Sequence, residues 1–239
     1  VQSGQYGQIR RTNWIITDWY RPQAYYDSGA WRATWSGEGG GVLLNQCPHQ
    51  LDLLQWMCGL PQTVQAFCQE GKWHDIEVED DVTAYLQFAN GATGVFVTTT
   101  GDAPGTNRFE VTGTLGKLVC ENDKLTFWKL AQDEREFCRT ATEGFAQPQC
   151  QQVEVETDGE NLQHVGVLNA FAGKILHGTP LVAEGTEGLG GLTLSNAMHL
   201  SSWLGRAVDI PFDEELFLSE LNKRRATSRK KESKDITFS

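Results

Sequence analysis

Apolar and polar residues alternate along much of the first 130 residues, and this is the period of β-strands that bury one face. The alternation is clearest in residues 82–88, where one face would carry Val82, Ala84, Leu86 and Phe88. The same reasoning predicts further strands at Gln8 to Arg21, Thr63 to Trp73, a return through Val95 and Val97, Asn107 to Thr112, Lys117 to Glu121, Lys124 to Leu130, Gln152 to Thr157 and Val208 to Pro211.

The pattern changes to a helical period after residue 160. One helix would carry Val165, Leu168, Ala172, Ile175 and Leu176 on one face and end at Gly178 and Pro180. A second would carry Leu189, Leu192, Ala197, Leu200 and Leu204, with Thr186 as its N-cap. Asp213 would cap a last helix that runs to about Arg224. Glu134 to Pro148 has no clear period, and we expect a loop there.

Short turn sequences separate the predicted strands. Asn90-Gly91 is typical of a primed two-residue hairpin turn, and Asn122-Asp123 and Gly113 to Gly116 mark two others. Strands joined this closely form a meandering sheet. The sequence therefore predicts an α+β fold in which a large, mostly antiparallel sheet has helices packed on one face.

The segment from Glu38 to Gly59 concentrates candidate chemistry. Three glycines, Gly39 to Gly41, would let backbone or a ligand come close where a helix begins. Residues 50–58 are mostly apolar, which predicts a helix buried on most sides that ends at Gly59. Asn45, His49 and Asp52 are spaced by four and three residues, so a continuous helix would place them on one face. Pro48 lacks an amide proton and should split the segment into a short turn and a main helix.

This segment resembles a known family. Gly-Gly-Gly, an acid or amide at Asn45, His49, Asp52 and the ending Trp-x-x-Gly-x-Pro are similar to the active-site segment of the glucose-fructose oxidoreductase/inositol dehydrogenase (Gfo/Idh/MocA) family. Weaker likeness extends over residues 1–220, including Gly-Gln-Ile-Arg-Arg and Trp31-Arg32 near the start. The resemblance implies a C-terminal domain, residues 1–222, that binds substrate and forms oligomers, followed by a basic tail, residues 223–239.

His49 and Asn45 are the candidate catalytic residues. Oxidation of a secondary alcohol needs a base that titrates near the working pH, and histidine meets this need. The commoner family pattern has Asp where this chain has Asn45, and an amide can orient a ring or bind a hydroxyl but adds no charge. Whether His49 is a base or only a binder therefore stays open. Asp52 could orient His49, bind substrate or bond nearby backbone.

Rings and guanidinium groups crowd the residues after the first strand. Tyr20, Arg21, Trp31 and Arg32 could bind a hydroxyl-rich ligand, since planar donors and ring faces suit sugars. The resemblance places Trp31 and Arg32 near a nicotinamide cofactor as well. The alternative is that these rings only wall the core.

Charge and composition limit the kinds of molecule that the chain could bind. The net charge of −11 argues against nucleic acid, although residues 223–239 carry seven Lys and Arg against Glu232 and Asp235. That basic run should be a solvated helix end or a frayed tail, with an interaction tail as the alternative. No apolar run is long enough to predict a membrane span. Six cysteines without Cys-x-x-Cys spacing predict no metal site and a reduced, cytoplasmic protein. The acidic cluster Glu77 to Asp81 is expected to be a solvated loop.

The chain has no strand followed by Gly-x-Gly-x-x-Gly, the motif that holds a dinucleotide. Together with the missing initiator Met, this suggests a chain without the family's nucleotide-binding domain. One hypothesis is then the substrate-binding, oligomerising domain of an NAD- or NADP-dependent oxidoreductase, a sugar or polyol dehydrogenase, inactive alone and forming a dimer or tetramer through the sheet face. The alternative is a non-catalytic carbohydrate-binding or scaffold protein that keeps the fold.

Overall fold

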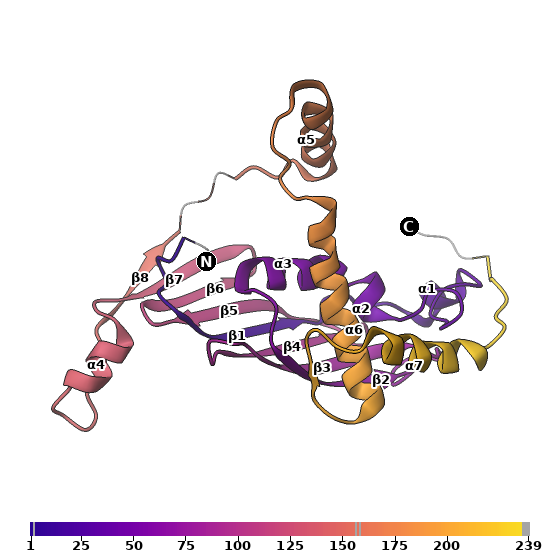
Figure 1. Ribbon diagram of the computed structural model, residues 1–239, viewed down its shortest axis with the longest axis horizontal. Helices are drawn as coiled ribbons and strands as arrows, with labels where there is room; N and C mark the ends of the chain where they lie inside the picture. The colour runs from indigo at the N-terminus through magenta and orange to yellow at the C-terminus, as the bar shows by residue number, and fades with distance from the viewer. Residues whose placement is uncertain (2, 156, 158, 236–239) are drawn as a thin grey trace.

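A nine-stranded sheet forms the centre of the computed structural model, which describes residues 1, 3–155, 157 and 159–235 (Figure 1). Its strand order is β8-β7-β6-β5-β1-β4-β3-β2-β9. The strands are β1 (Ile9–Ile16), β2 (Thr63–Glu70), β3 (Glu79–Gln87), β4 (Thr93–Thr99), β5 (Asn107–Gly113), β6 (Gly116–Glu121), β7 (Lys124–Leu130), β8 (Cys150–Glu154) and β9 (Val208–Asp209).

β1 lies between β5 and β4 and is parallel to β4, while the other pairs are antiparallel. A strand from the start of the chain is thus inserted into the meander, with Trp14 beside Phe96 on one side and Phe109 on the other. These three rings are buried together in the core. The expected mostly antiparallel sheet is confirmed.

The helices are α1 (Gln23–Asp27), α2 (Val42–Asn45), α3 (Pro48–Cys58), α4 (Glu134–Thr140), α5 (Gln163–His177), α6 (Gly188–Leu204), preceded by a 3-10 turn (Gly185–Glu187), and α7 (Glu214–Ala226). Of these, α3 and α6 pack on one face of the sheet. Leu51 and Leu54 of α3 and Met198 of α6 are buried against the inward side chains of the strands. The fold is therefore α+β, as predicted. Within the described residues, no helix is both long and apolar enough to cross a membrane.

Of the two predicted Asn-containing turns, Asn122-Asp123 is confirmed and Asn90-Gly91 differs from expectation. Gly91 has φ +84°, but Asn90 does not have positive φ, and the amide of Phe88 donates to the carbonyl of Ala92 at 2.9 Å. This is a three-residue loop, so the predicted primed two-residue turn is wrong there. The primed turn is instead Asn122-Asp123, whose φ values of 52° and 58° are both positive.

Three other local predictions are wrong. Residues 134–140 are a helix, because Asp133 accepts from the backbone nitrogens of Arg135 and Glu136. The turn before α6 is capped by Glu184, in a reciprocal pair with Glu187, and not by Thr186. The acidic cluster is not a solvated loop, since β3 begins at Glu79 and both Glu79 and Asp80 are buried. The cap at Asp213 is confirmed, with its carboxylate 3.0 Å from the amide nitrogen of Leu216.

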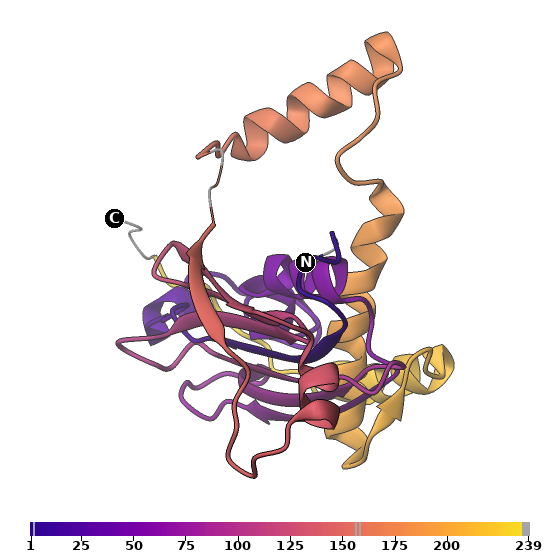
Figure 2. The same ribbon diagram turned by 90° about the vertical axis from the view of Figure 1, so that its left-hand side faces the viewer.

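α5 stands apart from the body of the molecule (Figures 1 and 2). The helix forms and ends at Gly178, which has φ +70°, as the sequence predicts. Its apolar face, however, is exposed: Val165 is 61%, Leu168 66% and Ile175 68% accessible. At the start of α6, Leu189 and Leu192 are exposed as well. The described chain therefore leaves this apolar surface without a covering layer.

Candidate functional site

The segment from Glu38 to Gly59 folds as two short pieces. α2 ends at Asn45 and α3 begins at Pro48, so the split expected from Pro48 is confirmed. α3 is not buried on most sides, which corrects the sequence prediction. Only one stripe of it faces the sheet, and Leu53 is 43% and Trp56 51% exposed on the other. The outer face of α3 is thus open to a partner or ligand.

Glu79 occupies the space below the start of α2. Both of its carboxylate oxygens lie 2.9 Å from the backbone nitrogen of Gly41, and Oε1 lies 3.1 Å from that of Leu43. A negative charge at a helix start satisfies amides that have no partner within the helix. Gly41 therefore allows a close backbone approach, since a Cβ on it would lie 2.0 Å from the carbonyl oxygen of Glu79.

A second buried group completes the support under α2. His199 of α6 places Nε2 3.0 Å from Glu79 Oε2, an ion-pair distance without hydrogen-bond geometry. Its ring stacks on Trp203 and meets the edge of Trp35. Burial raises the pKa of Glu79, but the charge of His199 and the amide of Leu43 outweigh it and hold that pKa below its usual value. Glu79 is therefore ionised at neutral pH.

Asn45 joins a cluster of polar side chains above this support. Its side-chain oxygen accepts from the Tyr25 hydroxyl at 3.0 Å and from Gln46 at 2.9 Å, while its amide donates to Glu38. Arg32 donates to the same Tyr25 hydroxyl at 2.9 Å. We call Tyr25, Arg32, Glu38, Asn45 and Gln46 the Asn45 cluster. Of these residues, only Asn45 and Arg32 were predicted from the sequence, although Tyr25 lies in the ring-rich stretch after the first strand.

Burial raises the pKa of Glu38 above its usual value, even though it accepts hydrogen bonds from the backbone of Ala33 and from Asn45. A carboxyl group with a raised pKa next to hydroxyl and amide donors can bind a ligand hydroxyl or exchange a proton with it. Glu38 was not among the residues predicted. The signal that could have found it is its place directly before the three glycines.

Trp31 and Arg32 lie together at the edge of the cluster. The Arg32 guanidinium is 4.5 Å from the centre of the Tyr25 ring and 4.6 Å from that of Trp31. Trp31 is 49% exposed, so one ring face stays open to solvent. Arg21 lies 5.1 Å from the Tyr25 ring, and its backbone carbonyl is 2.8 Å from Nε2 of His74. Tyr20 is exposed, and its carbonyl accepts from Arg21. Arg21 and Arg32 thus converge on Tyr25, and Trp31 lies against Arg32.

Asp80 holds the backbone of Arg21 in place through His74. Its carboxylate accepts from the backbone nitrogens of Trp73 and His74 and contacts Nδ1 of His74 at 2.9 Å. Because His74 holds the Arg21 carbonyl through its other nitrogen, this buried carboxylate orients a ring that in turn holds the loop. The acidic cluster that the sequence suggested was surface is therefore part of the support for the site.

The structure does not bring the three spaced residues together. His49 is exposed in the first turn of α3, and no hydrogen bond joins it to Asn45 or Asp52. Asp52 accepts from Gln55 at 3.0 Å and lies against Gly191 of α6. The face shared by Asn45, His49 and Asp52 is thus lost at the break between α2 and α3. His49 stays available to a ligand above the outer face of α3.

Comparison with known proteins identifies the domain. Residues 1–119 match the model of the GFO/IDH/MocA C-terminal domain. None of the curated proteins compared with the chain matches it by sequence.

Solved structures match over most of the chain. The WlbA dehydrogenase from Chromobacterium violaceum, in complex with NADH and UDP-GlcNAcA, is 28% identical, with a TM-score of 0.70 over 89% of this chain and 57% of its own. The WlbA dehydrogenase from Bordetella pertussis, with the same two ligands, is 24% identical, with a TM-score of 0.70 over 89% and 58%. Levoglucosan dehydrogenase in complex with NADH and L-sorbose is 19% identical, with a TM-score of 0.66 over 89% and 61%. The last two comparisons concern the fold alone.

The chain spans 57–61% of the length of these dehydrogenases. The matched residues include β1, the Trp31-Arg32 loop, the Asn45 cluster and α3. The chain therefore belongs to the GFO/IDH/MocA family, of which it carries a C-terminal domain.

Proposed function

We propose that the chain is the substrate-binding and oligomerising domain of an NAD(P)-dependent oxidoreductase that acts on a secondary hydroxyl of a sugar, polyol or sugar nucleotide. The observation that carries the proposal is the 28% identity, over 89% of this chain, to a dehydrogenase solved with NADH and UDP-GlcNAcA. The domain would comprise residues 1–222, with residues 223–239 as a basic extension.

His49 is the proposed group for proton transfer or for binding the reacting hydroxyl. Its exposure at the start of α3 supports this, since a substrate could reach it without a rearrangement of the core. Asn45 would act from the cluster below, where Tyr25 and Gln46 already orient its amide. Tyr20, Arg21, Trp31, Arg32 and Asp52 would bind the remainder of the substrate.

The chain's own residues fit only one end of a dinucleotide. The open ring face of Trp31 and the guanidinium of Arg32 suit a nicotinamide edge, but no Gly-x-Gly-x-x-Gly turn is present in the sequence for the pyrophosphate. When bound, NAD or NADP would supply the hydride acceptor. A nucleotide-binding domain would therefore have to meet this chain, and the exposed Leu53 and Trp56 of α3 support contact there. The chain alone would be inactive.

The sheet face opposite α3 and α6 is the proposed oligomer interface. It presents Phe67 (60% exposed) on β2 and Tyr85 (41%) on the adjacent β3, and Trp128 (41%) on β7, farther along the same sheet. A contiguous exposed apolar patch on a soluble protein commonly marks an interaction surface. A second copy, related by a two-fold axis, is the proposed occupant.

Calorimetric titration of the purified chain tests the binding part of the proposal. We expect UDP-GlcNAcA, a free sugar or a polyol to bind with a Kd of about 0.1–10 mM, and NADH to bind more weakly than about 1 mM. Arg32→Ala should abolish the carbohydrate signal, whereas Arg11→Ala, an exposed arginine of β1, should leave it unchanged. Tight NADH binding, or carbohydrate binding that Arg32→Ala does not weaken, would contradict the proposal.

A further inference from the structure

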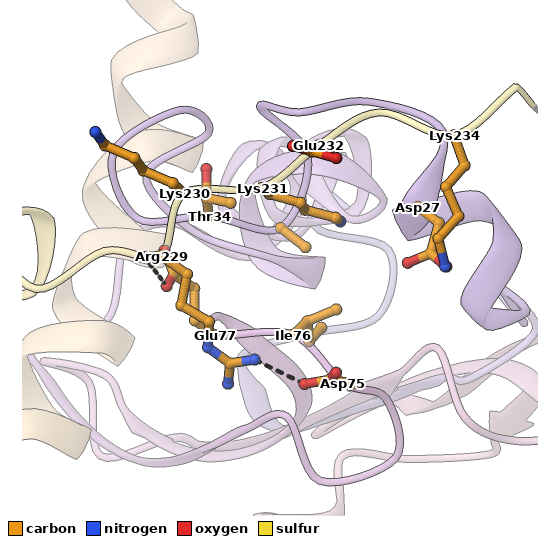
Figure 3. A pocket seen from close by; sticks show the side chains of 11 residues that line it. Asp27, Thr34, Asp75, Ile76, Glu77, Arg229, Lys230, Lys231, Glu232 and Lys234 are labelled. Carbon is orange, nitrogen blue, oxygen red and sulfur yellow. Dashed lines mark hydrogen bonds and ion pairs between the residues drawn. The ribbon is translucent and has the colours of Figure 1, made fainter.

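The chain continues past α7 and returns to the ring-rich loop. Residues 228–234, which we call the C-terminal strap, run alongside residues 26–36 (Figure 3). Together with residues 75–77, the two segments line a cavity of about 330 Å³. The strap was expected to be a solvated helix end or an interaction tail. Ser228, Arg229, Lys231, Ser233 and Lys234 are instead bonded to other parts of the molecule.

The two ends of the strap are held by acidic residues. At the first end, the Glu77 carboxylate accepts from the Ser228 hydroxyl and, at 2.7 Å, from the backbone nitrogen of Arg229. The same carboxylate accepts from the backbone nitrogen of Trp35 at 2.6 Å, so it joins strap and loop directly. At the far end, Lys234 lies 2.6 Å from the Asp27 carboxylate, and its backbone nitrogen donates to the Asp27 carbonyl at 2.9 Å.

Lys231 lies between these anchors and points at the loop. Its Nζ donates to the backbone carbonyl of Tyr26 and, at 3.4 Å, to that of Arg32. Those two carbonyls flank the turn that carries Trp31. Figure 3 shows Lys230, the next residue, directed away from Lys231 and Lys234, and Lys230 forms no hydrogen bond or ion pair with a described residue. Lys231 alone among the strap lysines therefore ties both sides of the turn.

The environment of Lys231 fits this role. Burial lowers its pKa, while the charges of Asp27, Glu38 and Asp75 act in the opposite direction. Partial burial of a lysine ammonium group costs free energy unless hydrogen-bond acceptors replace the lost water. Here the replacements are the two loop carbonyls, so the contact fixes the backbone on either side of Trp31.

We propose that Lys231, held by the strap, is a positioning residue for the loop that presents Trp31 and Arg32 to ligand. This assignment rests on the proposed function for the ligand itself, but the hold on the loop stands on the geometry alone. The Arg32 guanidinium donates to the Tyr25 hydroxyl of the Asn45 cluster, and the Arg32 carbonyl accepts from Lys231 of the strap. Loss of the outer contact frees the loop and leaves the Asn45 cluster intact.

Hydrogen exchange of the backbone amides in residues 26–36 tests the hold. Lys231→Met keeps the length of the side chain and removes its donors, and we expect exchange in this loop to accelerate at least about 10-fold. Lys230→Met removes the same charge one residue away and should change nothing. Unchanged exchange in Lys231→Met, or equal acceleration in both variants, would overturn the proposal.

Titration with UDP-GlcNAcA tests the positioning. We expect the Kd to rise about 5–10-fold in Lys231→Met, because the loop must then be ordered on binding, and to recover at least partly in Lys231→Arg. Accelerated exchange with an unchanged Kd would overturn the role in ligand binding. Absence of any binding by the unmodified chain would contradict the proposed function and leave the exchange result to judge the strap.

Discussion

Both carboxylate oxygens of Glu79 lie 2.9 Å from the backbone nitrogen of Gly41. This contact couples the start of β3 to the start of α2, and therefore to the Asn45 cluster that α2 carries. It also explains the third glycine, because β3 approaches so closely that a side chain on residue 41 would meet the backbone of Glu79.

Gly41→Ala should consequently destabilise the fold. A Cβ at this position would lie 2.0 Å from a backbone oxygen, so either α2 or β3 must move. We expect the free energy of unfolding to fall by roughly 3 kcal/mol or more in denaturant titrations. Gly185→Ala, where a Cβ meets nothing within 4 Å, should change it by less than about 0.5 kcal/mol. Equal stability of the two variants would contradict the close approach.

Glu79→Gln should change how stability depends on pH. The pKa of Glu79 lies below its usual 4.5 in the folded chain, so ionised Glu79 favours folding. That contribution is complete above pH 4.5 and is lost as pH falls through the folded-state pKa. We expect the variant to lose roughly 1–3 kcal/mol at pH 7, with a smaller loss in acid. A loss of stability that grows toward acid pH would contradict a lowered pKa of Glu79.

Sequence pattern located the strands and most helix ends, because period and capping chemistry are local. It ran two strands too far, since β1 ends at Ile16 and not Arg21, and β2 at Glu70 and not Trp73. It failed at Glu79 and Asp80, although Asp80 shares the parity of Val82, Ala84 and Leu86 and could have been placed inward. Burial of Glu79 depends on α2, whose start meets the start of β3 although the contacting residues are 36–38 positions apart in the chain. No local pattern contains that contact.

The candidate site was predicted only in part. Asn45 and the Trp31-Arg32 pair were found by type and spacing, but the shared face with His49 and Asp52 assumed a continuous helix. Tyr25, Glu38 and Gln46 join Asn45 only because the loop after β1 folds back over α2. The packing of the C-terminal strap was not predicted, because its partners Asp27 and Glu77 are far from it in the sequence.

Asn45→Asp should expose the electrostatics of the cluster. The Asn45 amide donates to Glu38, whose pKa is already raised by burial. A second carboxylate would replace that donor with a like charge, so we expect roughly 1–3 kcal/mol lower stability at pH 7 and a smaller difference at pH 5, as the pair takes up a proton. Asn107→Asp is the control, since Asn107 uses only its oxygen, toward Trp14. A loss that is the same at both pH values would contradict the like-charge account.

Phe67→Glu should dissociate the proposed dimer. Phe67 is 60% exposed on the open sheet face, where a second copy would bury it. Light scattering at micromolar concentration should give the mass of a dimer or tetramer for the unmodified chain and a monomer for the variant. Phe145→Glu, at a fully exposed phenylalanine between α4 and β8, should not change the mass. A monomeric unmodified chain would remove this interface.

The proposed role of this chain is to supply the substrate side of a nicotinamide-dependent oxidation. A fusion that joins the dinucleotide-binding part of the Chromobacterium violaceum dehydrogenase to the start of this chain tests this role, with NADH formation measured on sugars, polyols and UDP-GlcNAcA. We predict turnover with one of these classes, reduced roughly 100-fold or more by His49→Ala and unchanged by His177→Ala on the separate α5. A folded, NADH-binding fusion that oxidises none of them, or that His49→Ala leaves unaffected, would contradict this role and favour a carbohydrate-binding protein without catalysis.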